Sequence, residues 1–211
     1  VATPLGKVTP ESVIDHCGIL GRIHSSRPRV VSLTQATEMG TVYRADEIAA
    51  VSESARRFGL KLHMDGARFA NAVARLGARP ADLTWRAGVD ILSFGGTKNG
   101  LGSGEAIVVF DGALAEELPW RIKQAGQLNS KMRLMSAPWL ELLGDDVWLA
   151  NARHANAMAD RLAEGLQRIA GLKLMFPVEA NGVFVDMLPS IQAGLRAKGW
   201  QFITFIGQTG C

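Results

Sequence analysis

The feature that most constrains the fold is an alternation of short β-branched runs with amphipathic helical runs between residues 29 and 110. Strands separated by helices of this length are typical of βαβ units, whose strands run parallel within one sheet. The helical runs are followed by Gly59 and Gly77, where a left-handed cap would end each helix. The sequence therefore predicts an α/β fold with a mainly parallel sheet. Strands are expected at 30–34, 60–64, 89–94 and 105–110, and helices at 44–58 and 69–76.

The pattern becomes mainly helical after residue 111. We expect Pro119 and Pro138 to interrupt this region, because proline lacks the backbone N–H that a helix interior needs. An amphipathic run at 145–169 predicts a long connecting helix. A strand at 182–188, a helix at 191–198 and a strand at 200–206 then predict part of a small α+β C-terminal domain. We expect a division into residues 1–143, from a large domain, and residues 144–211, the connecting helix with an incomplete small domain.

The composition argues against several classes of protein. With 47% hydrophobic and 20% charged residues among 211, the chain can bury a sizeable core. Its net charge of +3 comes from scattered residues, which gives little support to nucleic-acid binding. No apolar stretch approaches the roughly 18 residues of a membrane span, and the two cysteines make no disulfide framework. We therefore expect a cytoplasmic protein without a nucleic-acid or membrane partner. Because the sequence begins at Val1 and not at a methionine, we also expect it to be a fragment.

Charged side chains follow two of the predicted strands. Asp65 and Arg68 come after the second strand, and Lys98 lies in a glycine-rich loop after the third. In open α/β sheets, ligands bind outside the carboxyl ends of the strands, so these three side chains are expected at one edge. A lysine whose amine can lose its proton, through burial or nearby positive charge, forms an imine with an aldehyde. An aspartate keeps a pyridinium nitrogen protonated, and an arginine can bind a phenolate or a carboxylate. Together they indicate pyridoxal phosphate.

Each of these residues also has an ordinary interpretation, such as a solvated turn residue or a helix cap, and the hypothesis depends on their occurring together. The segment 95–100 does not have the spacing of a phosphate-binding P-loop. We expect His63 to pack and not to act on the cofactor, on the argument that neighbouring strand residues point to opposite faces. The other histidines lack metal-ligand spacing. Lys123, Lys131 and Arg133 are by default a solvated basic face.

Three segments, 32–43, 63–71 and 93–100, together resemble the low-specificity L-threonine aldolases, a family of fold-type I pyridoxal-phosphate enzymes. The likeness extends from about residue 7 to 207. It implies that Lys98 is the Schiff-base lysine, that Asp65 is the pyridinium partner, and that Arg68 lies near the phenolate and the substrate carboxylate. It places Arg133 at a dimer interface, where a basic residue reaches the neighbouring subunit's cofactor and substrate. Residues 1–143 would then be the central part of the cofactor-binding large domain, without its N-terminal third.

The resemblance implies aldol cleavage of β-hydroxy-α-amino acids, such as L-threonine, L-allo-threonine or phenylserine, to glycine and an aldehyde. It also implies a dimer of dimers. Some relatives carry a histidine near the position of Thr37, so here Thr37 or a water would have to take the β-hydroxyl proton. Two alternatives remain open. The scaffold also serves β-eliminating lyases and aminotransferases, and the truncated chain could fold or dimerise without cofactor or catalysis.

Overall fold

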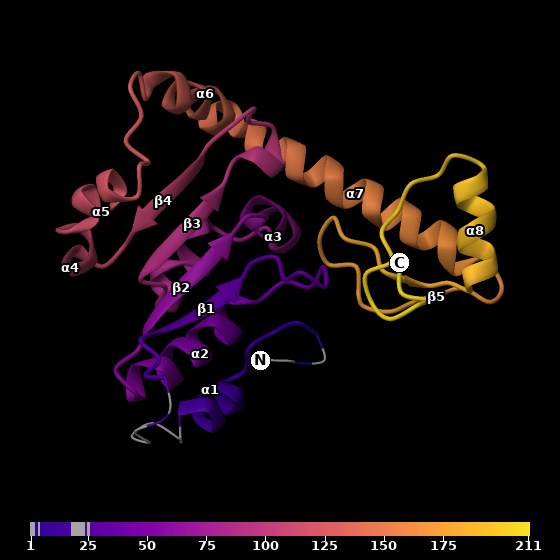
Figure 1. The fold of residues 1–211 in the computed structure, drawn as a ribbon, viewed down its shortest axis with the longest axis horizontal. Coiled ribbons are helices and arrows are strands. Elements are labelled where there is room, and N and C mark those ends of the chain that lie inside the picture. Colours follow the sequence, from indigo (N-terminus) through magenta and orange to yellow (C-terminus); the bar gives the residue numbers. More distant parts are fainter. Residues whose placement is uncertain (1–2, 4, 18–23, 25) are drawn as a thin grey trace.

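A four-stranded sheet forms the centre of the molecule in the computed structural model, which describes residues 3, 5–17, 24 and 26–211. The strands lie in the order β1 (Val30–Thr34), β2 (Lys61–Gly66), β3 (Ile91–Gly95) and β4 (Glu105–Val109) (Figure 1). The first three are parallel, and β4 runs antiparallel to β3. The prediction of a mainly parallel α/β sheet is confirmed.

The helices between the strands pack on one face of this sheet. Leu33, Leu62, Met64 and Leu92 alternate with polar residues along the strands and share one buried cluster with side chains of α2 (Ala45–Arg57) and α3 (Phe69–Leu76). The glycines expected to end the helices do so, since Gly59 and Gly77 follow them with φ of 68° and 57°. Because strand side chains alternate between the two faces, burial of these four residues places their strand neighbours on the opposite face of the sheet.

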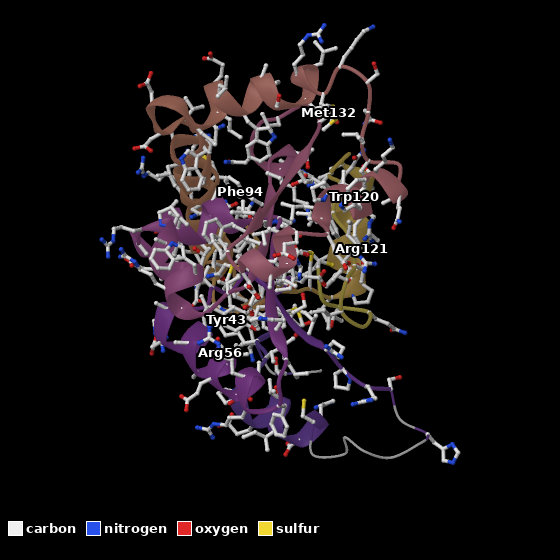
Figure 2. All side chains as sticks on the ribbon, turned by 90° about the vertical axis from the view of Figure 1, so that its left-hand side faces the viewer. Tyr43, Arg56, Phe94, Trp120, Arg121 and Met132 are labelled. Atoms are coloured by element: carbon white, nitrogen blue, oxygen red, sulfur yellow. The ribbon has the colours of Figure 1, made fainter. Side chains whose placement is uncertain are left out.

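Phe94 connects the sheet to three helices at the end where β3 stops. Its ring centroid lies 5.9 Å from that of Phe69 in α3, 5.2 Å from that of Trp139 in α6 (Arg133–Leu143), and 5.6 Å from that of Trp148 in α7 (Val147–Gln167). Figure 2 shows Phe94 among densely packed side chains. The loop that follows β3 therefore starts from a fixed point.

The remaining helices lie at the edges of this core. In the helical region after residue 111, Pro119 lies near the start of α5, as expected where one element ends and the next begins. The break expected at Pro138 is wrong, because α6 continues through this residue. The carbonyl of Leu134 loses its usual helical donor there, yet Leu134 is 69% exposed and water can replace that donor. The other elements are α1 (Pro10–Cys17), η1 (Pro80–Leu83), η2 (Trp85–Ala87), η3 (Thr97–Asn99), α4 (Gly112–Ala115), α5 (Leu118–Gln124) and η4 (Gly144–Asp146).

The long helix α7 carries the chain from the sheet to a smaller C-terminal region (Figure 1). Reciprocal hydrogen bonds fix it to α3: Asn71 Nδ2 donates to Asn156 Oδ1 at 2.9 Å, and Asn156 Nδ2 donates to the Asn71 carbonyl at 3.0 Å. Arg75 adds an ion pair to Asp160 at 2.8 Å. The expected connecting helix is confirmed, and the division between residues 143 and 144, where α6 meets η4, stays a prediction.

The C-terminal region has less strand than expected. It contains the short strands β5 (Lys173–Leu174) and β6 (Val185–Asp186), and α8 (Pro189–Ala197) lies close to the predicted helix. The strand predicted at 200–206 is wrong: a single bridge joins Ile206 to Gly210. The chain turns back at this point, and the segment 185–187 hydrogen-bonds to Thr209 and Cys211 in place of that strand. No helix among the described residues is long and apolar enough to cross a membrane.

Candidate active site

The carboxyl ends of β2 and β3 lie in direct backbone contact. A Cβ atom on Gly95 would lie 2.6 Å from both the Cα and the carbonyl oxygen of Ala67, closer than atoms can approach. Only glycine therefore allows the turn after β2 to lie against the loop after β3. This contact places the end of β2, which contains Asp65, and the turn that contains Arg68 beside the loop that contains Lys98, as the sequence predicted.

Asp65 presents one free carboxylate oxygen at this edge. Its Oδ1 accepts the Ala67 N–H at 2.9 Å, which orients the carboxylate. Its backbone carbonyl accepts the Gln35 N–H at 2.8 Å and ties the end of β2 to the segment after β1. Within the described chain, Oδ2 has no hydrogen-bond partner and no basic side chain forms an ion pair with Asp65. The free oxygen can therefore accept a hydrogen bond from a protonated ring nitrogen.

Arg68 stands one residue before α3, at its N-cap position. Its carbonyl accepts the N–H of Asn71 at 3.0 Å and that of Ala36 at 3.4 Å, so its backbone is fixed. The side chain is half-buried, and its guanidinium has no hydrogen-bond or ion-pair partner among the residues the structure describes. This donor group is available for a phenolate or a carboxylate.

Lys98 lies in η3, and its side chain is exposed. The backbone around it is nevertheless held, since Asn99 is buried and donates from Nδ2 to the Trp148 carbonyl at 2.9 Å. Asn151 Nδ2 donates to the Asn99 carbonyl at 2.9 Å. Two residues of α7 thus hold the residue after Lys98.

Arg133 is the first residue of α6 and is exposed. The helix passes the lysine loop, because Cβ atoms on Gly96 and Gly104 would meet Trp139 and Met135. No hydrogen bond or ion pair in the described residues joins Arg133 to Asp65, Arg68 or Lys98. The structure therefore brings together three of the four predicted site residues, and the role of Arg133 at a neighbouring subunit stays a prediction.

The argument that separated His63 from Asp65 is wrong. The two residues are two positions apart in β2, so their side chains lie on the same face of the sheet. The His63 ring lies between two hydroxyls, with Nδ1 at 2.7 Å from Ser32 Oγ and Nε2 at 3.0 Å from Ser93 Oγ. Burial lowers the pKa of His63, and the nearby Asp65 carboxylate partly offsets that effect. The spacing of two residues between His63 and Asp65 in the sequence already predicts that their side chains share one face of the strand.

Thr37 is unsuited to act as a base in this arrangement. It is 2% exposed, and its hydroxyl lies 2.7 Å from the Thr41 hydroxyl. The same oxygen accepts the Thr41 N–H at 3.2 Å. Thr37 therefore holds the 37–41 turn, and of the two candidates for removing the β-hydroxyl proton, a water molecule is favoured over its hydroxyl.

The residues at this edge fit pyridoxal phosphate in chemical type. They supply an exposed amine, a carboxylate with one oxygen that no described residue binds, and a guanidinium that no described residue pairs, from two neighbouring strand ends held in contact at Gly95. A carboxylate for the ring nitrogen, an amine for the aldehyde and a cationic donor for the phenolate or the substrate are the groups this cofactor requires. No cluster of His, Cys, Asp or Glu in the described residues could hold a metal ion.

Comparison with known proteins identifies the family. The profile of a family described as beta-eliminating lyase matches residues 1–189. The chain belongs to that family. The beta-eliminating lyase family consists of enzymes, and the sequence resemblance to threonine aldolases is confirmed by individual relatives. The chain is 57% identical over 209 residues to the low specificity L-threonine aldolase of Pseudomonas aeruginosa, with 99% of this chain and 60% of that protein covered.

A second relative gives the same result. The low specificity L-threonine aldolase of a Pseudomonas species is 56% identical, with 97% of this chain and 59% of the relative covered. This beta-eliminating lyase family member thus spans about three-fifths of the length of the curated relatives it matches.

A solved structure confirms the fold class. The threonine aldolase of Leishmania major superposes with a TM-score of 0.89 at 27% identity, covering 100% of this chain and 62% of that one. A pyridoxal-phosphate-bound C–S lyase from Staphylococcus hominis shares the fold with a TM-score of 0.62 at 14% identity, covering 96% and 50%. The family and the fold agree with the fold-type I class and with pyridoxal phosphate as the cofactor.

Proposed function

We propose that the protein containing this chain cleaves β-hydroxy-α-amino acids, such as L-threonine, L-allo-threonine or phenylserine, into glycine and an aldehyde, with pyridoxal phosphate as cofactor. The observation that carries the proposal is the backbone contact at Gly95, which holds the turn after Asp65 against the Lys98 loop. Identity of 57% to a low specificity L-threonine aldolase supports this choice within the family.

Each site residue has a separate task in this reaction. The cofactor, when bound, supplies a carbonyl that attaches the amino acid and a ring that accepts the electrons of the breaking bond. The free oxygen of Asp65 would hold a proton on the ring nitrogen, and the Lys98 amine would attach the cofactor and give way to the substrate amine. The Arg68 guanidinium would bind the cofactor's phenolate oxygen or the substrate carboxylate with its paired N–H donors.

Replacement of the lysine tests the proposal. In the full-length protein, Lys98→Ala is expected to abolish both the visible absorbance of attached cofactor and the release of glycine from L-threonine. The exposed Lys123, placed far from the site in α5, gives a matched control, since Lys123→Ala removes the same amine from another helix. Unchanged absorbance and glycine release in Lys98→Ala would refute the proposal.

A second candidate is β-elimination on the same site, which the description of the matching family favours. The same aspartate, arginine and lysine would serve both reactions, because the ring of the bound cofactor would accept the electron pair left on the α-carbon in either case. In aldol cleavage the bond that breaks is Cα–Cβ, and in β-elimination the Cα–H bond breaks before the β-substituent leaves. The products separate the two. Glycine with an aldehyde supports aldol cleavage, whereas pyruvate and ammonia from serine would establish the lyase.

We also propose that the full protein is a homo-oligomer, a dimer of dimers, in the cytoplasm. Large apolar side chains are well exposed on α5, with Trp120 at 70%, and on α6, the helix that begins at Arg133, with Leu134 at 69% and Leu140 at 76%. Figure 2 shows Trp120 and Met132 at the outside of the molecule. Covering this surface with a second copy would remove it from water. The free thiols Cys17 and Cys211 support a reducing compartment. Light scattering measures the molar mass of the full-length protein, and a mass of four subunits is expected.

A further inference from the structure

Glu105 faces back onto the loop that carries Lys98. It is the first residue of β4 and pairs with Gly95, the last residue of β3. Its carboxylate accepts hydrogen bonds from the two residues that precede Lys98. The Gly96 N–H donates to Oε2 at 2.8 Å, the Thr97 N–H donates to Oε1 at 3.3 Å, and the Thr97 hydroxyl donates to the same Oε1.

These bonds have no substitute among the described residues. Gly96 is buried beneath Leu101 and Trp139, so water cannot easily replace the acceptor of its N–H. Glu105 itself is exposed, and within the described chain it forms no ion pair. Among the described residues, every hydrogen bond of its carboxylate goes to Gly96 or Thr97. A carboxylate that accepts N–H and O–H donors forms stronger bonds than a neutral acceptor.

Lys98 is thus held from both sides along the chain. Glu105 fixes the two residues before it, and Trp148 and Asn151 of α7 fix Asn99 after it. Between these two attachments the Lys98 side chain is free and exposed. The direction in which the amine leaves the loop is therefore set by its neighbours and not by contacts of its own.

We propose that Glu105 is a positioning residue for Lys98: its carboxylate fixes the backbone of Gly96 and Thr97, and so holds the amine where the cofactor aldehyde can meet it. This inference rests on the proposed function for the use of the amine. The attachment of the loop to Glu105 is a property of the protein without cofactor and can be measured by itself.

The test compares Glu105→Gln with the parent full-length protein. Glutamine keeps the size of the side chain, but its NH₂ group meets an N–H donor, so at least one bond is lost. In cofactor-free protein, we expect amide hydrogen exchange at Gly96 and Thr97 to become about tenfold faster, the equivalent of one charge-assisted hydrogen bond. Borohydride trapping after addition of pyridoxal phosphate should show correspondingly slower attachment at Lys98.

Control variants separate positioning from a general loss of structure. Glu53→Gln changes an exposed glutamate on α2, far from the loop, and should leave both rates unchanged. Thr97→Ser keeps the hydroxyl donor and should behave as the parent does. Thr97→Val removes that donor, should increase the exchange rate at Thr97, and provides the test if Glu105→Gln fails to fold.

The outcomes are distinguishable. Exchange and trapping rates in Glu105→Gln and Thr97→Val that match those of Glu53→Gln would overturn the inference. A lower melting temperature with an unchanged trapping rate would also overturn it, because that result describes a purely structural role. If the parent itself shows no attachment at Lys98 while exchange responds to Glu105→Gln, the proposed function fails and the loop attachment is supported.

Discussion

Replacing Gly95 by alanine should disrupt the fold and the site together. The added Cβ would lie 2.6 Å from the Cα and from the carbonyl oxygen of Ala67, and 2.8 Å from its carbonyl carbon. All three are backbone atoms, and Gly95 is itself bonded into the β3–β4 ladder. Neither side can yield by turning a side chain, so the strand ends must move apart.

The expected cost is at the upper end of the range for overpacking, about 3 kcal/mol in the free energy of unfolding. For a chain of this size, that corresponds to a fall of roughly 6–12 °C in the melting temperature. Urea unfolding followed by circular dichroism measures it. Gly102→Ala is the matched control, because Gly102 lies in the segment that joins β3 to β4 and a Cβ there has no atom within 4 Å. It should stay within about 1 kcal/mol of the parent.

The same displacement moves the Asp65 turn away from the Lys98 loop. We therefore expect the full-length Gly95→Ala protein to bind pyridoxal phosphate more weakly by about tenfold, or ~1.4 kcal/mol, at temperatures where it is still folded. An unfolding free energy and a cofactor affinity equal to those of Gly102→Ala would refute the reasoning, since the two variants differ only in what the methyl group meets.

Two pH effects follow from buried groups. Burial raises the pKa of Tyr43 to about 12 from 10.0. The unfolded chain therefore ionises first, and roughly 3 kcal/mol of stability should be lost between pH 10 and 12. Unfolding curves of Tyr43→Phe should lack this loss, and an equal loss in both proteins would contradict the explanation. Burial instead lowers the pKa of His63 below 6.5, so the unfolded chain takes up the proton first and stability falls as the pH drops from 6.5. In His63→Gln the unfolding free energy should fall less over this range, and an identical slope would rule the explanation out.

The sequence was sufficient for the part of the fold that periodicity controls. Strand and helix alternation up to residue 110 predicted the sheet and its helices, since each element buries one face. The C-terminal region was predicted less well. The apolar run at 200–206 has the composition of a strand, yet Ile203 is 76% exposed and no described strand pairs with this run, because the segment 185–187 hydrogen-bonds to residues 209 and 211 instead.

The site was predictable where residues share a strand end, and not where they meet through long-range contacts. Asp65 lies near the end of β2, and Arg68 and Lys98 come shortly after the ends of β2 and β3, so their placement is visible in the sequence. Glu105 and Asn151 reach the same loop from β4 and α7. Nothing in their local sequence distinguishes them from ordinary polar surface residues, because the contact depends on how the loop folds back.

The position of Asp65 is a consequence of core packing. In the observed register, Leu33, Met64 and Leu92 lie side by side across three strands and are all buried. Because strand residues alternate, the next residues, Thr34, Asp65 and Ser93, must then lie side by side on the opposite face. A slip of one residue in β2 would bury Asp65 and expose Met64, which the core opposes. The apolar side chains that stabilise the sheet therefore also determine which face presents the carboxylate to a cofactor.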